Sequence, residues 1–80
     1  MSERIENLGR HAELRETCKR LVAEVEALRD KLRRNLPIHE DVDVLDGEEI
    51  LTVAMALNTS LQELTGVNRK IKILSRELGN

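Results

Sequence analysis

The acidic segment HEDVDVLDGEEI is the densest cluster in this sequence of side chains that could bind a metal ion. A calcium loop of the EF-hand type requires acids at its first, third and fifth positions, glycine at the sixth and glutamate at the twelfth. Counted from Asp41, the third residue is Asp43, as required. Leu45, Asp46 and Thr52 then occupy the fifth, sixth and twelfth positions, where they do not fit. The sequence therefore predicts no metal site in this segment.

The same acids fit the start of a helix. Asp46 can accept hydrogen bonds as an N-cap, and Glu49, three residues later, can complete a capping box. Residues 40–49 contain six acids and no base, whereas residues 29–34 contain four bases and one acid. Acids at a helix N-terminus and bases at a helix C-terminus both complement the helix dipoles, so we expect the two segments to lie close together. Whether either segment also contacts a partner stays open.

His11 and Cys18 are the other residues that could do chemistry. They lie seven residues apart, about 10 Å along a helix, which is too far to share one metal ion or one proton. The sequence contains no glycine-rich phosphate loop and no paired-histidine motif. We therefore predict no catalytic residue, no metal and no cofactor, and a protein that is not an enzyme.

The composition favours long helices. The 80 residues include 35% charged and 40% hydrophobic residues, one proline, and no Phe, Tyr or Trp. A single cysteine excludes an intrachain disulfide and favours a reducing, cytoplasmic setting. No apolar run reaches the length of a membrane span, and the net charge of −2 makes a nucleic-acid partner unlikely. Because so short a chain buries little surface, we expect it to need a partner.

Hydrophobic periodicity is the strongest signal in the sequence. Apolar residues recur at alternating steps of three and four in both halves of the chain, which predicts two helices that pack along a heptad seam. In the second half, Leu61 and Asn68 flank this seam. The predicted interface comprises Leu14, Cys18, Leu21, Val25, Leu28, Leu32, Ile50, Val53, Leu57, Leu61, Leu64, Val67, Asn68, Ile71, Leu74 and Leu78.

We therefore predict one all-α domain over residues 1–80, an antiparallel, coiled-coil-like hairpin of two helices. The helices are expected at about 3–35 and 47–78, with a loop at about 36–46. Pro37 is expected to stop the first helix, and Asp46 with Gly47 to mark the turn into the second.

Two local packing features are also expected. Apolar residues of the loop are predicted to fold back as a plug over the end of the bundle. Apolar residues before Glu13 follow a seam shifted by one residue, so the regular packing should slip near Gly9 to Glu13. The plug residues are Leu36, Ile38, Val42 and Leu45, and the shifted residues are Ile5, Leu8 and Ala12.

One family resemblance covers about half of the chain. The segments VEALRDKL and DGEEILTVAMALNTSL resemble the helical hairpin of the sporulation-type aspartyl-phosphate phosphatases, which dephosphorylate response regulators. The second helix of that family carries a Ser-Gln-x-x-Asp signature, and the matching positions here are Ala54, Met55 and Asn58. The resemblance implies a regulator of a phosphorylated partner, with signature residues that are not preserved.

The function favoured by the sequence is a cytoplasmic protein–protein interaction or regulatory module. Two exposed apolar stripes favour a homodimer or higher oligomer, most simply a four-helix bundle of two hairpins. Besides the phosphatase-like regulator, the alternative is a small chaperone or adaptor that receives another protein's helix. No membrane partner is expected.

Overall fold

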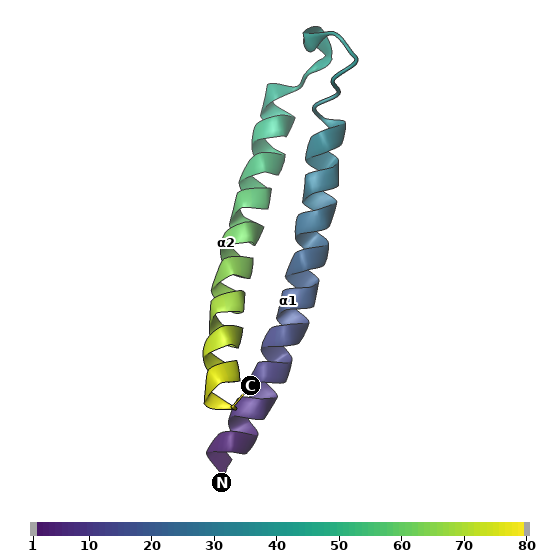
Figure 1. Ribbon diagram of the computed structural model, residues 1–80. Helices are drawn as coiled ribbons and strands as arrows, with labels where there is room; N and C mark the ends of the chain where they lie inside the picture. Colours follow the sequence, from purple (N-terminus) through teal and green to yellow (C-terminus); the bar gives the residue numbers. More distant parts are fainter. Residues whose placement is uncertain (1, 80) are drawn as a thin grey trace.

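The computed structural model describes residues 2–79 and shows two long helices that lie side by side (Figure 1). Helix α1 spans Ser2–Arg34, the short 3-10 helix η1 spans Val42–Val44, and helix α2 spans Gly47–Glu77. The helices run antiparallel, and the molecule measures 62 × 18 × 15 Å. Within the described residues there is no strand. The predicted all-α helical hairpin is confirmed.

Helix α1 ends at Arg34, three residues before Pro37. The amide of Asn35 still donates to Lys31 O at 3.2 Å, and the side-chain amide of Asn35 donates to the same oxygen at 3.0 Å. Two residues later, Pro37 has no amide proton to continue the ladder, and its ring restricts the preceding residue. The chain therefore leaves the helix at this point.

Helix α2 ends in a glycine turn. The amide of Leu78 donates to Leu74 O at 2.9 Å, and that of Gly79 donates to Arg76 O at 3.1 Å. Gly79 has a φ of +81°, which a residue with a Cβ rarely adopts. The turn satisfies carbonyls that the last helical turn leaves free. Leu78, which precedes this turn, continues the heptad face of Ile71 and Leu74 and is only 6% exposed.

The core is a single narrow seam between the two helices. Its best-buried members are Leu21, Val53, Leu74 and Leu78, together with the small polar side chain of Ser60. Most of the other predicted interface residues lie at the edges of the seam and are half-buried, namely Leu14, Cys18, Val25, Leu28, Leu32, Ile50, Leu57, Leu64, Val67 and Ile71. Leu61 and Asn68 lie on the flank and are exposed. The helix phases expected from the heptads are those observed.

The predicted slip of the seam before Glu13 is wrong. The half-buried residues at this end are Asn7 and His11, which continue the heptad of Leu14 without a shift. Ile5 and Leu8 instead remain 64% and 48% exposed. The apolar residues that suggested the slip therefore lie outside the helix pair.

The predicted apolar plug is also wrong. The connection projects beyond the ends of both helices instead of folding back over them (Figure 1). Ile38 and Val42 are 87% and 77% exposed, and Leu36 and Leu45 are also exposed. Two helices alone offer these side chains no end surface wide enough to cover them.

Over residues 2–79, neither helix combines the length and the apolar character needed to cross a bilayer.

Candidate functional site

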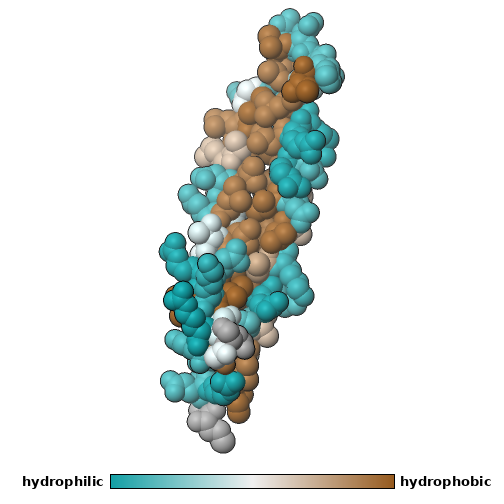
Figure 2. All heavy atoms as spheres, viewed as in Figure 1, coloured by the Kyte–Doolittle hydropathy of each residue, from teal (hydrophilic) through white to brown (hydrophobic). Residues whose placement is uncertain are grey.

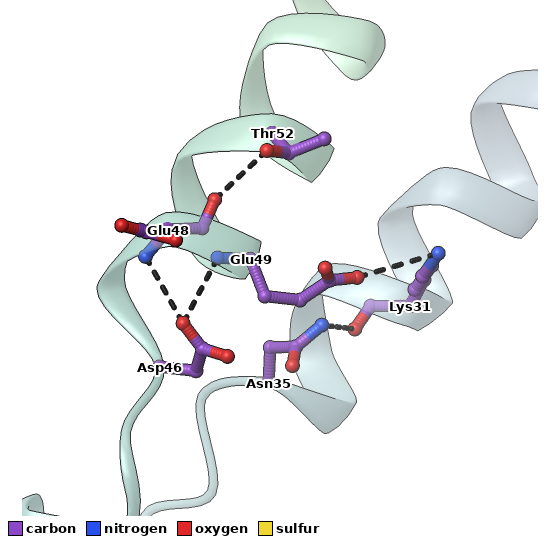
Figure 3. Close-up of polar contacts among 6 residues, drawn as sticks. All are labelled: Lys31, Asn35, Asp46, Glu48, Glu49 and Thr52. Atoms are coloured by element: carbon purple, nitrogen blue, oxygen red, sulfur yellow. Dashed lines mark hydrogen bonds and ion pairs between the residues drawn. The ribbon is translucent and has the colours of Figure 1, made fainter.

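The acidic residues next to α2 form a helix cap (Figure 3). One carboxylate oxygen of Asp46 accepts from the amides of Glu48 and Glu49 at 3.1 and 3.2 Å. The hydroxyl of Thr52 donates to Glu48 O at 2.9 Å in the next turn. Asp46 thus satisfies two amides that a helix start leaves without partners, as the sequence predicted.

Glu49 plays a different part from the one expected. Its carboxylate lies 3.4 Å from Lys31 Nζ on α1, so it ties the two helices together at the loop end (Figure 3). Among the hydrogen bonds of residues 2–79, none returns from the Asp46 amide to Glu49, so the expected capping box is only half formed. The predicted proximity of the acidic and basic segments is confirmed by this ion pair.

The rest of the acidic connection has no such structural role. Glu40, Asp41 and Asp43 are all exposed, and no salt bridge in residues 2–79 involves them. In the same residues, no three His, Cys, Asp or Glu side chains are grouped so that they could hold a metal ion. These three acids therefore form a free negative tip on the hairpin.

Two polar contacts join the helices near the chain termini. His11 Nε2 lies 2.9 Å from Ser75 Oγ, and Cys18 Sγ donates to Asn68 Oδ1 at 3.3 Å. The sequence placed His11 and Cys18 on one strip of a helix but did not predict these partners. The signal that could have found them is the matching seven-residue step from Asn68 to Ser75.

These contacts set the register of the hairpin. Seven residues are close to two helical turns, so residues seven apart occupy one strip of a helix. Following the same strips toward the loop brings Val25 to the level of Leu61 and then Leu32 to the level of Ala54. This flank of the hairpin is therefore polar near the termini and apolar near the loop.

The apolar part of this flank is open to solvent. We call it the open face and define it by Val22, Leu36, Leu51, Ala54 and Leu61. Figure 2 shows apolar residues gathered over both helices on the loop half of the molecule; hydrophilic residues predominate below them, with apolar residues again at the lower end. The large side chains among them are 38% to 60% exposed. At the loop end, a hollow lined by Arg29, Leu32, Arg33, Leu36, Pro37 and Ile38 continues the open face.

The terminal half of the same flank is basic. Arg15 and Lys72 extend the strips of Val22 and Leu51 toward the termini, and Lys19 lies beside them. No salt bridge of the described residues involves Arg15 or Lys72, whereas Lys19 is 3.5 Å from Glu16. We call Arg15, Lys19 and Lys72 the basic strip. One flank thus carries an apolar patch between a negative tip and a positive strip.

The positions of the phosphatase signature lie on the loop half of α2. Ala54 is half-buried on the open face, while Met55 and Asn58 are exposed. Met55 O accepts a hydrogen bond from Thr59 Oγ1 at 3.1 Å, a contact within the helix. These three residues do not bring an acid–base group and a nucleophile together.

Comparison of the chain with protein-family models, with curated proteins and with solved structures finds no match.

Proposed function

We propose that this protein is a homodimerising interaction module whose two hairpins associate through their open faces. The observation that supports it is excess surface. A compact chain of 9.1 kDa exposes about 4,900 Å², whereas this hairpin exposes 6344 Å². Its radius of gyration is 18.0 Å, against about 12 Å for a compact domain of this length.

The excess of about 1,400 Å² per chain is more than the about 600–1,000 Å² that each partner contributes to a specific dimer interface of standard size. A lone hairpin of this kind is marginal, because the four hydrophobic side chains that are buried among residues 3–79 make a small core. Covering the open face with a second copy would add a second seam and produce a four-helix bundle. The exposed leucines of the open face then become interior residues.

The proposed role is binding rather than catalysis. Binding is supported by the open flank, where partly exposed aliphatic side chains lie between charged groups, as in a protein–protein interface. A second candidate is an adaptor that binds another protein's helix, favoured by the hollow between Arg29 and Ile38. A cytoplasmic setting remains part of the proposal, on the single free Cys18.

Sedimentation equilibrium tests the proposal. From about 1 to 100 µM we expect a mass of two chains, with a dissociation constant in the micromolar range or below. The double variant L51E/L61E should be a folded monomer, because it puts two charges into the proposed interface. I73E is the matched control, since Ile73 is 51% exposed and lies in a hollow with Arg10, Lys70 and Glu77, away from the open face.

A monomer throughout this range would refute homodimerisation. A dimer that L51E/L61E leaves intact, or that I73E breaks, would show that a different surface associates.

A further inference from the structure

The distribution of charge and apolar surface on the open flank selects one way of pairing two copies. This inference rests on the proposed homodimer and specifies its geometry. Two copies packed face to face around a two-fold axis can place their loops at the same end or at opposite ends. These alternatives bring different charges together.

With both loops at one end, like charges meet. The free acids of the tip, Glu40, Asp41 and Asp43, would lie beside the same acids of the second copy. The basic strips of the two copies would also lie beside each other, since they occupy equal heights. Like charges placed together at an interface oppose association.

With loops at opposite ends, the two copies can also be displaced from each other along the helix axes. We call this displacement the stagger, and the overlap of the apolar patches determines it. Full overlap of the two hairpins would press each apolar patch against the partner's basic strip. Sliding the copies until the patches coincide places the two-fold axis midway between Val22 and Leu36, near Arg29 on α1 and Asn58 on α2. The two copies of Arg29, each 3.8 Å from its own Asp30 carboxylate, then form one like-charge contact at the axis. Around this axis, Ala54 of one copy comes opposite Leu61 of the other, a small residue against a large one.

The same stagger joins opposite charges. The tip lies about 20 Å from Arg29: about 8 Å of helix to Arg34, then about 12 Å by which the 62 Å molecule exceeds the length of α1. Arg15 lies about 21 Å from Arg29 in the other direction. The two-fold axis therefore brings the acidic tip of each copy to the basic strip of the other.

We propose that two copies associate through their open faces with loops at opposite ends, each inserting its acidic tip, Glu40, Asp41 and Asp43, against the partner's Arg15 and Lys72. Each dimer contains this contact twice. The apolar patches supply the affinity, and the tip contacts select the orientation and the stagger.

Single-cysteine crosslinking tests the geometry. In a C18S background, whose serine hydroxyl can still donate to Asn68, N58C places one thiol near the axis of each copy. We expect rapid disulfide or short-linker crosslinking of N58C into dimers. T65C is the matched control, because Thr65 is exposed on the same strip but about 10 Å farther from the axis, so its two thiols lie about 21 Å apart.

Charge reversal tests the tip contact independently. R15E/K72E should weaken the dimer about tenfold or more at low salt, and adding D41K/D43K to the same chain should restore its affinity to within about threefold. D41K/D43K alone should weaken it to a similar extent.

The outcomes separate this inference from the proposed function. A monomeric wild-type protein overturns both. A dimer in which T65C crosslinks as readily as N58C, or in which neither crosslinks, overturns the staggered geometry and leaves the homodimer intact. A dimer whose affinity R15E/K72E does not change overturns the tip contact. Far-UV circular dichroism of each variant confirms that the hairpin is folded.

Discussion

Leu21→Ala is the most direct test of the seam. Leu21 is 1% exposed and is the largest fully buried side chain of the described residues. The substitution removes three carbons, worth about 2.4 kcal/mol of transfer free energy at about 0.8 kcal/mol each. A residual cavity adds to this cost, although a layer of two helices can partly collapse around it. We expect a loss of about 2.5–3.5 kcal/mol in the free energy of unfolding.

Ile73→Ala removes the same number of carbons from a side chain that is 51% exposed. About half of the transfer term, near 1.2 kcal/mol, should be lost. Alanine recovers about 0.4 kcal/mol through its higher helix propensity, which leaves a net cost of about 0.8 kcal/mol. The two variants should therefore differ about threefold in their effect.

Urea unfolding followed by circular dichroism measures both variants, at one fixed protein concentration because association and folding are linked. In thermal unfolding at the same protein concentration, the melting temperature should fall by about 10–25 °C for Leu21→Ala and by about 3–6 °C for Ile73→Ala. Equal effects would mean that the seam does not run through Leu21, and the phases of both helices would have to be revised.

Three further predictions concern polar groups. Asp46→Ala should lower the free energy of unfolding by about 0.5–2 kcal/mol through loss of the cap, whereas Asp41→Ala, which caps nothing, should leave a dilute monomer unchanged in urea unfolding. Millimolar calcium or magnesium should not move the melting temperature, and a rise equivalent to about 2.7 kcal/mol would instead indicate a site filled at a hundredfold excess over its dissociation constant. A double-mutant cycle of His11→Ala and Ser75→Ala should give a coupling of about 0.5–1.5 kcal/mol; additive effects would show that their 2.9 Å contact contributes nothing.

The helices and their seam could be predicted because both depend on local pattern. The alternating steps of three and four through Val53, Leu57 and Leu64 specify a helix face whatever surrounds it. The cap at Asp46 was predictable for a similar reason, since an acceptor is needed at the start of a helix. Pro37 likewise marks the end of α1 without reference to the rest of the fold.

The predictions that were wrong concern side chains whose burial or partners depend on residues that are distant in the sequence. Leu36 and Ile38 were expected to be covered because they are apolar, but a two-helix hairpin has no third element to cover them. Glu49 has the right spacing for a capping box, yet Lys31 lies within 3.4 Å and engages its carboxylate instead. Neither result is encoded in spacing along one helix.

The register of the hairpin also could not be predicted from the spacing along one helix. It determines which side chains lie together on the open face. Heptads specify which face of each helix packs, but not which heptad of α1 meets which heptad of α2. Once Cys18 meets Asn68, the apolar ends of both strips coincide near the loop and their polar ends coincide near the termini. A shift of one heptad would move one strip about 10 Å along the other and would bring Leu32 to the level of Leu61 in place of Ala54. The open face therefore results from pairing, and a partner can recognise it only on the folded hairpin.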